Sequence, residues 1–434
     1  MGIKAWSVEH GRRLMTKYPT LRHITTLASG TAIAQVVALG ASVVTARLFT
    51  PETFGQYAIY GSIVSILATI ASLRMDMTIV LPEDDDSARR ISKIATVSNL
   101  AVAALATLLA LLLHDVVLSV YGSEELARWM PLIGLSAFFL AQVTVLQYWF
   151  NRKTDFRTIS LNRVQQMVGS SGGQVATGLA GFTSLLGLIL GTMLGPAFAF
   201  FNLRRKSRDL LEPVSEDTPS SGALLRRYKK MPLLNLPNAL IDGIRINGIP
   251  MLIGLVALDT VGQFSRAWTI LQVPIGLMNG AISQVFFQKL SRVKPGEMYP
   301  LVKATIVRSL LISAIPFGLI YLVSPWFFLF VFGPQWDLSG DIARALTPWL
   351  AMQLVTSPIS TLFVVTDNQQ LMLGFSIVFA AVPLSLLYFL PLELLTTLTI
   401  MGFAMALLLI VQLVMALAVS RRFDARRPAT PETT

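Results

Sequence analysis

Four arginines lie within long apolar stretches of the chain, and a fifth lies at the end of one. The deepest is Arg245, roughly 20 Å from the nearer end of its stretch at about 1.5 Å per helical residue. Asp242 comes three residues earlier, on the same helical face. Charges in an apolar medium are costly and usually face a partner or a hydrated cavity. Arg245 is therefore either a cation that binds an anion in a cavity or half of an ion pair that fixes helix packing.

The remaining arginines offer the same chemistry, because a guanidinium binds phosphate-like anions through charge-assisted hydrogen bonds. They are Arg266, Arg74, Arg308 and Arg47. Snorkelling to the membrane surface is the alternative for all of them except Arg266. Asp76 follows Arg74 by two residues, so in a continuous helix the two side chains would not share a face.

Amides and small residues gather in one apolar stretch. Asn162, Arg163 and Gln166 could line a hydrated path, and so could Asn247, two residues after Arg245. The glycines and serines at 169–173 favour close packing of two helices. These polar side chains are therefore candidates for a cavity lining, and the small ones for a helix contact.

No catalytic arrangement is present in the sequence. It contains no cysteine, three scattered histidines, and none of the sequence patterns of zinc proteases, P-loop proteins or serine hydrolases. The acidic run 83–86 precedes Arg89 and favours a helix N-terminus rather than a cation site. We therefore expect neither an enzyme nor a resident metal or cofactor. Without a nucleotide-binding motif, any transport would have to draw on gradients or on substrate concentration.

Membrane helices must position these residues. The chain of 434 residues is 53% hydrophobic and 14% charged, with a mean hydropathy of +0.63, whereas soluble domains carry about 25% charged residues. Long continuous apolar runs favour helices over a barrel of short alternating strands. We expect an all-α integral membrane protein with twelve spans, at 24–48, 53–80, 88–113, 127–150, 157–180, 183–203, 232–257, 260–288, 299–323, 342–365, 368–390 and 395–419.

A six-residue phrase occurs twice. Residues 52–57 (ETFGQY) recur at 259–264 (DTVGQF), each between the first two apolar segments of its half. Duplicated halves are typical of secondary transporters. We predict two six-helix lobes related by a pseudo-two-fold axis along the membrane normal. The expected parts are an N-terminal segment 1–20, an N-lobe 21–203, a flexible basic linker 204–231, a C-lobe 232–420 and a tail 421–434.

The basic residues set the orientation. With the N-terminus in the cytoplasm, 28 of the 35 Lys and Arg residues fall on the cytoplasmic side, as the positive-inside rule requires. Both termini are then cytoplasmic. The net charge of +11 follows from topology and the lipid bilayer, so it does not indicate nucleic acid.

Five stretches, in order and spacing, resemble the bacterial polysaccharide-repeat flippases (Wzx, or O-antigen flippases). These belong to the multidrug/oligosaccharidyl-lipid/polysaccharide exporter superfamily. The stretches are Ala46–Gly55, Leu73–Pro82, Gly262–Phe287, Phe332–Trp336 and Ser357–Ser360.

This resemblance implies two lobes around a central cavity and alternating access in a bacterial inner membrane. The implied substrate is an oligosaccharide repeat unit on undecaprenyl pyrophosphate, used for O-antigen, capsule or exopolysaccharide. The implied partners are this lipid-linked glycan and the downstream polymerase and chain-length machinery. The interior arginines would bind the pyrophosphate, and the membrane potential or a coupled H⁺ or Na⁺ carried by Asp76 or Asp242 would drive export.

Three alternatives remain open. A lipid II-type flippase or a drug exporter of the same superfamily would share the fold, but interior arginines favour an anionic substrate over cationic drugs. A membrane polysaccharide polymerase should present a large outer loop with catalytic side chains, and the outer loops expected here are short.

Overall fold

The computed structural model describes residues 35–290, 293, 296–366, 368–390 and 392–425. The predicted segment 1–20 and most of the predicted tail 421–434 lie outside these residues. Within the described residues the chain is helical and contains no strand. It divides into two compact units, Met1–Asn247 and Gly248–Thr434, called unit 1 and unit 2 here. The division falls within a helix, α11, rather than in the predicted linker 204–231.

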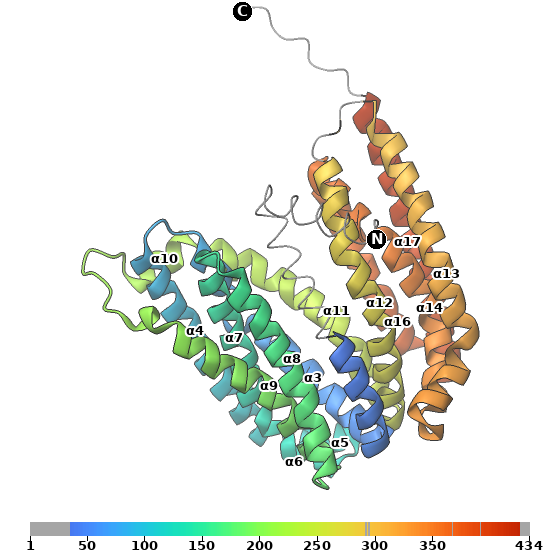
Figure 1. The fold of residues 1–434 in the computed structure, drawn as a ribbon, viewed down its shortest axis with the longest axis horizontal. Coiled ribbons are helices and arrows are strands. Elements are labelled where there is room, and N and C mark those ends of the chain that lie inside the picture. Colours follow the sequence, from blue (N-terminus) through green and yellow to red (C-terminus); the bar gives the residue numbers. More distant parts are fainter. Residues whose placement is uncertain (1–34, 291–292, 294–295, 367, 391, 426–434) are drawn as a thin grey trace, which may run out of the picture. The chain divides into compact units, whose positions relative to one another are not determined.

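Unit 1 is built around one central helix. The helix α7 (Ile133–Arg152) packs against α3 (Pro51–Ala71), α4 (Asp85–Leu112) and α9 (Leu185–Lys206) (Figure 1). Its buried side chains include Trp149, which is fully enclosed. The other described elements are a helix over Gln35–Leu48, α5 (His114–Tyr121), α6 (Glu124–Trp129), η2 (Met130–Leu132), α8 (Phe156–Leu179), η3 (Arg208–Leu211), α10 (Ser221–Arg227), η4 (Met231–Asn235) and α11 (Leu236–Gly254).

The second predicted span, 53–80, ends earlier as an α-helix than expected. The helix α3 stops at Ala71, and a 3₁₀ helix, η1 (Met75–Val80), follows a turn. In that turn Leu73 has φ 51° and Arg74 has φ 59°, both in the left-handed region. The interpretation that the side chains of Arg74 and Asp76 cannot share a face assumed a continuous helix, and the turn removes that constraint.

Glycines bring α8 and α9 into backbone contact. A Cβ atom on Gly173 would lie 2.1 Å from the carbonyl oxygen of Gly191, and one on Gly169 would lie 2.8 Å from the Cα of Gly195. Only hydrogen fits at these positions. The prediction that the small residues of 169–173 serve close helix packing is confirmed for Gly169 and Gly173.

Unit 2 is also organised around one helix. The helix α14 (Asp337–Thr356) packs against α12 (Leu258–Leu290), α13 (Met298–Phe332) and α17 (Leu394–Ala425). The other elements are η5 (Pro334–Trp336), η6 (Ile359–Thr361), α15 (Leu362–Val365) and α16 (Gln369–Phe389). The ninth predicted span, 299–323, is longer than expected. The spans 299–323 and 342–365 leave 324–341 as an outer loop rich in Trp and Phe, whereas α13 continues through the aromatic part of this stretch to Phe332.

The repeated phrase has equivalent contacts in the two units. Gln56 is buried near the start of α3 and donates to the Oγ of Ser123 at 3.1 Å. Its counterpart Gln263 is buried near the start of α12 and donates to the carbonyl of Gln335 at 2.7 Å. Gln56 thus joins α3 to the residue before α6, and Gln263 joins α12 to the short segment before α14.

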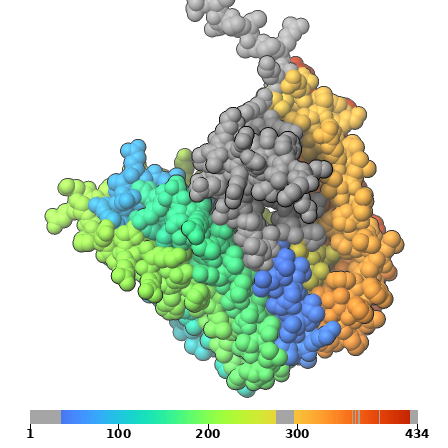
Figure 2. Space-filling view, in the orientation of Figure 1, coloured from blue at the N-terminus to red at the C-terminus, as the bar shows by residue number. Residues whose placement is uncertain are grey.

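Seven described helices are long and apolar enough to cross a membrane. They cover 51–71, 85–112, 124–152, 185–206, 298–332, 370–389 and 394–425. This count covers only the described residues, so the number twelve stays a prediction. Exposed apolar side chains cover α8 and α9, among them Met167, Leu179 and Phe198. The green atoms of these two helices form much of the visible surface of unit 1 in Figure 2.

The segment predicted to be a flexible linker lies against unit 1. Leu224 of α10 is buried in a cluster with Met75, Ile91 and Trp149. The side chain of Arg90 donates to the carbonyls of Thr218 and Pro219 at 2.8 and 2.9 Å. Residues 208–227 therefore form a folded strap, which we call the interlobe strap.

The acidic run 83–86 stabilises a helix start, as predicted. Asp84 is the N-cap of α4 and accepts from the backbone N–H of Ser87 at 2.5 Å, which lowers the pKa of its carboxyl. Asp85 pairs with Arg152 at 2.8 Å, and Asp86 pairs with Arg89 at 2.7 Å. The run is thus committed to α4 and its neighbours.

Candidate functional site: a polar cavity in unit 1

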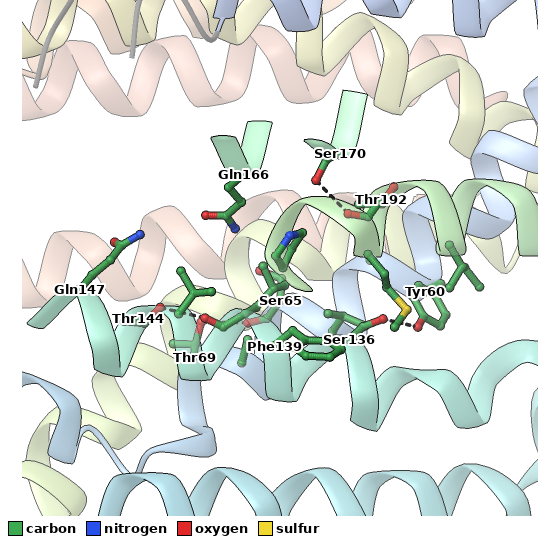
Figure 3. Close-up of a pocket in the computed structure, with 18 of the residues that line it drawn as sticks. Tyr60, Ser65, Thr69, Ser136, Phe139, Thr144, Gln147, Gln166, Ser170 and Thr192 are labelled. Carbon is green, nitrogen blue, oxygen red and sulfur yellow. Dashed lines mark hydrogen bonds between the residues drawn. The ribbon is translucent and has the colours of Figure 1, made fainter. Parts of the chain in front are cut away.

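Unit 1 encloses a cavity of about 510 Å³ between α3, α7, α8, α9 and the turn before η1. Figure 3 shows hydroxyl and amide side chains from these helices pointing into it. Ligand pockets typically measure about 300–1,000 Å³, so the cavity has the size of a small-molecule site.

Helical spacing explains why these side chains converge. On α3 the lining residues Gly61, Ser65 and Thr69 are four apart, and on α7 Ser136, Leu140 and Thr144 are four apart. Residues at this spacing lie on one helical face. The α8 and α9 lining follows the same spacing, with Gln166, Ser170, Thr192 and Pro196.

Charged side chains occupy one end of the cavity. Arg74 and Asp76 follow α3, and Arg163 lies in the second turn of α8. The lining thus carries two cations and one carboxylate. This is the end at which α7 ends, α8 begins and α9 ends, called the basic end of unit 1. The Lys and Arg distribution predicts that it faces the cytoplasm.

Arg74 has few hydrogen-bond acceptors for a guanidinium, which has five N–H donors. Within the described part of the chain, its only hydrogen-bond acceptor is the sulfur of Met77, at 3.0 Å. The Nε of Arg74 is buried and has no partner there. Asp76 is buried and accepts from Ser72 at 2.6 Å. An anion entering the cavity would supply acceptors that the protein does not.

The walls of the cavity are held by hydrogen bonds between helices. The hydroxyls of Tyr60 and Ser136 lie 2.7 Å apart and link α3 to α7 (Figure 3). Ser170 donates to the carbonyl of Thr192 at 2.8 Å and links α8 to α9. A lining fixed in this way presents preformed donors and acceptors of the kind that sugar hydroxyls need.

The structure brings together Arg74, Asp76, Arg163 and Gln166 among the predicted site residues. Asn162, which was predicted to line the cavity together with Arg163 and Gln166, lies behind its wall instead. Its side chain is fully buried, accepts from Gln147 at 3.1 Å and donates to the carbonyl of Ala199 at 3.2 Å. Asn162 therefore joins α7, α8 and α9 and supports the cavity without lining it.

Three predicted residues lie together on α11. Arg245 forms an ion pair with Asp242 at 3.3 Å, and the Asp242 side chain is largely exposed. Asn247 donates to the carbonyl of Gly243 at 2.9 Å. The packing interpretation assumed a buried pair, whereas the carboxylate here is exposed. These three residues do not line the unit 1 cavity. Arg47 is exposed at the end of the helix Gln35–Leu48.

The two predicted arginines of unit 2 have different environments. Arg266 is buried, with its guanidinium carbon 4.6 Å from the ring centre of Trp336 and 5.5 Å from that of Phe332. These rings stabilise the cation through their π faces and would have to move before a ligand reached it from their side. Arg308 is exposed on α13.

Sequence reasoning missed the hydroxyls of the lining. Thr144 and Thr69 lie in strongly apolar helices, where each donates to a carbonyl four residues earlier. On α7, Thr144 and Gln147 are three residues apart. Polar residues that recur every three to four positions along one helix are the sequence signal that identifies a polar stripe. No group of three or more His, Asp or Glu residues that could hold a metal occurs within the described residues.

The fold is shared with solved membrane transporters. An inward-facing multidrug resistance transporter of the MATE family, in the MOP superfamily, matches with a TM-score of 0.68 and 16% identity over 90% of this chain and 96% of that one. The lipid II flippase MurJ, in an inward closed conformation, matches with a TM-score of 0.70 and 14% identity over 91% and 90%. A MOP superfamily transporter from Pyrococcus furiosus matches with a TM-score of 0.56 and 15% identity over 93% and 96%.

The chain is therefore an α-helical, multi-pass membrane protein with the MOP transporter fold. A family profile of polysaccharide biosynthesis proteins matches residues 44–340, and the chain belongs to this family. The predicted membership in a polysaccharide biosynthesis family with the MOP transporter fold is thus confirmed. No curated protein matches the chain in sequence.

Proposed function

We propose that the chain is a Wzx-type flippase of the bacterial inner membrane. It moves oligosaccharide repeat units linked to undecaprenyl pyrophosphate from the cytoplasmic to the outer face by alternating access. The products would serve O-antigen, capsule or exopolysaccharide synthesis, and a polymerase with its chain-length machinery would receive them. Family membership and the transporter fold support this class of function.

The unit 1 cavity carries the proposal. Arg74 and Arg163 at the basic end would bind the pyrophosphate through charge-assisted hydrogen bonds. The hydroxyl and amide groups deeper in the cavity would bind the attached sugar. The polyprenyl tail would stay in lipid while the headgroup crosses.

The membrane potential supplies a driving force for this substrate. Moving one charge across 100 mV is worth about 2.3 kcal/mol, so two negative charges leaving a negative interior gain about 4.6 kcal/mol per 100 mV. If H⁺ or Na⁺ is coupled instead, Asp76 is the better candidate, because it is buried at the cavity whereas Asp242 is exposed and paired with Arg245.

Two alternative substrates use the same fold. Lipid II also carries a pyrophosphate, so the cavity charge does not separate it from other lipid-linked glycans. Cationic drugs are disfavoured, because the lining has two arginines and one aspartate. A polysaccharide polymerase has the least support, since the solved neighbours are transporters by name.

The test is complementation in a bacterium that lacks its repeat-unit flippase. We expect Arg74→Gln and Arg163→Gln to abolish surface glycan and to cause lipid-linked repeat units to accumulate on the cytoplasmic face. The matched control is Arg157→Gln, which removes an exposed charge from the first turn of α8 outside the cavity. The control should restore surface glycan fully.

Normal glycan with both cavity variants would refute the assignment of the pyrophosphate to unit 1. Arg245→Ala then separates two sites, because loss of flipping in that variant alone would move the anion site to α11. A second strain, the source bacterium with the gene for this chain deleted, tests the alternative. Intact glycan and normal lipid-linked pools in that strain, with altered resistance to cationic drugs, would indicate a drug exporter.

A further inference from the structure

A second cavity in unit 1 lies on the opposite side of α7. It measures about 1,190 Å³ and extends between α4, α7, α9 and the interlobe strap. Phe138 and Gln142 of α7 line it, whereas Phe139 and Val143 line the polar cavity. The proposed function uses only the polar cavity.

The lining of the second cavity changes from charged to apolar along the axes of α4 and α9. On α4, Lys93 lies at the basic end, and Val97 and Ala101 follow at steps of four residues into the apolar part of the helix. On α9, Arg204 lies at the basic end, and Phe200 precedes it by four residues. Each helix thus presents a cation with apolar side chains one or two turns deeper on the same face.

The deeper wall is aromatic. Phe138 and Phe200 lie edge to face with ring centres 6.0 Å apart. Phe200 and Phe138 both contact further phenylalanines, so this part of the wall offers apolar surface. The hydroxyls and amide that also line the cavity include those of Thr96, Ser98 and Gln142.

Two of the four cations in this cavity are engaged by the protein. Arg89 pairs with Glu212 and Asp86, and Arg90 donates to carbonyls of the interlobe strap. Within the described residues, no hydrogen bond or ion pair involves the side chain of Lys93 or of Arg204. The one carboxylate of the lining, Glu212, pairs with Arg89. The lining therefore keeps an excess of positive charge, which would stabilise an anion bound near Lys93 and Arg204.

We propose that this cavity binds an anionic phospholipid of the inner leaflet. Lys93 and Arg204 would bind the phosphate, and Val97, Ala101, Phe138 and Phe200 would contact an acyl chain. The interlobe strap forms the mouth through Leu210 and Val214, so the lipid headgroup would touch the connection between the two halves. The lining places cations at the basic end and apolar side chains further along, which is the order of headgroup and acyl chain in a lipid. A free phosphate ion would need the cations but not the apolar part.

The experiment measures binding of dioleoylphosphatidylglycerol to the purified full chain by native mass spectrometry. Dioleoylphosphatidylcholine and glycerol phosphate are the competing probes. We expect saturable binding of phosphatidylglycerol alone. Lys93→Gln with Arg204→Gln should raise its apparent Kd by about tenfold or more, because two hydrogen bonds to charged groups are lost.

The matched control is Arg205→Gln with Lys206→Gln. It removes two positive charges from the same end of α9 at exposed positions outside the cavity and should leave the apparent Kd unchanged. Ala101→Trp tests the apolar part, since it fills the deep end and keeps every charge. It should also weaken binding.

Three results would overturn the proposal. Equal losses in the cavity and control pairs would indicate nonspecific attraction to basic residues. Equal binding of glycerol phosphate would indicate a free-phosphate site, and equal binding of phosphatidylcholine would indicate an ordinary lipid contact. None of these outcomes depends on whether the protein flips glycans, because the assay contains no transport step.

Discussion

Replacing Gly173 by alanine should loosen the cavity wall, whereas the same change at Gly172 should not. The Cβ atom added at Gly173 would start 2.1 Å from the carbonyl oxygen of Gly191, whereas ordinary contact begins at 3.4 Å. The contact is therefore about 1.3 Å too short, and the obstacle is backbone of α9. No atom lies within 4 Å of the Cβ position at Gly172.

The magnitudes follow from this geometry. Overpacking costs about 1–3 kcal/mol, while alanine gains about 1 kcal/mol over glycine in a helix. Gly172→Ala should therefore be neutral or stabilising. The alanine gain is common to both variants, so they should differ by the overpacking cost of about 1–3 kcal/mol, which corresponds to roughly 2–12 °C in Tm for a unit of this size.

Thermal unfolding of each purified variant in one detergent, followed by circular dichroism, checks this prediction. Because Ser170 and Thr192 join the same two helices at the cavity, Gly173→Ala should also reduce flipping. Equal Tm values for the two variants would refute the reasoning, since they would show that α8 and α9 are not in backbone contact at this point.

Three further predictions concern stability. Leu224→Ala should cost about 2–5 kcal/mol and expose the interlobe strap to protease, because this side chain is buried in unit 1; unchanged cleavage would contradict the docked strap. Ser339→Ala should cost about 1–3 kcal/mol, measured as a lower Tm, because Ser339 donates to the backbone carbonyl and side-chain oxygen of Gln263 at 3.0 and 2.5 Å. Trp336→Leu should lower Tm more than Trp336→Phe does, because phenylalanine keeps a ring face for Arg266; the reverse order would refute the cation–π contact.

The helices were predictable because lipid imposes a simple rule on sequence. A span needs about 20 apolar residues. Each of the twelve predicted stretches overlaps a helix among the described residues. The ends were less predictable. The aromatic run after Ser324 was interpreted as an outer loop, although Trp and Phe also suit the last turns of a membrane helix, and α13 continues to Phe332.

The cavity was predictable only in its charged part. Arg74, Asp76, Arg163 and Gln166 are conspicuous because each is polar in an apolar setting. Thr144 is not conspicuous, since threonine is common in membrane helices and its hydroxyl is partly satisfied by its own helix. Grouping the hydroxyls by helical face would have found the wall, but only the structure shows which four faces converge.

The turn after α3 links the fold to the proposed chemistry. Leu73 and Arg74 both have positive φ although neither is a glycine. This conformation costs roughly 1–2 kcal/mol for each residue. A continuous helix would avoid this cost and would place Arg74 and Asp76 on different faces. The break lets both line one cavity, with Asp76 held by Ser72. Strain of this kind persists where surrounding structure enforces it and is frequent at binding sites. The break thus places a cation and a carboxylate in the lining of one cavity, at a local cost in backbone stability.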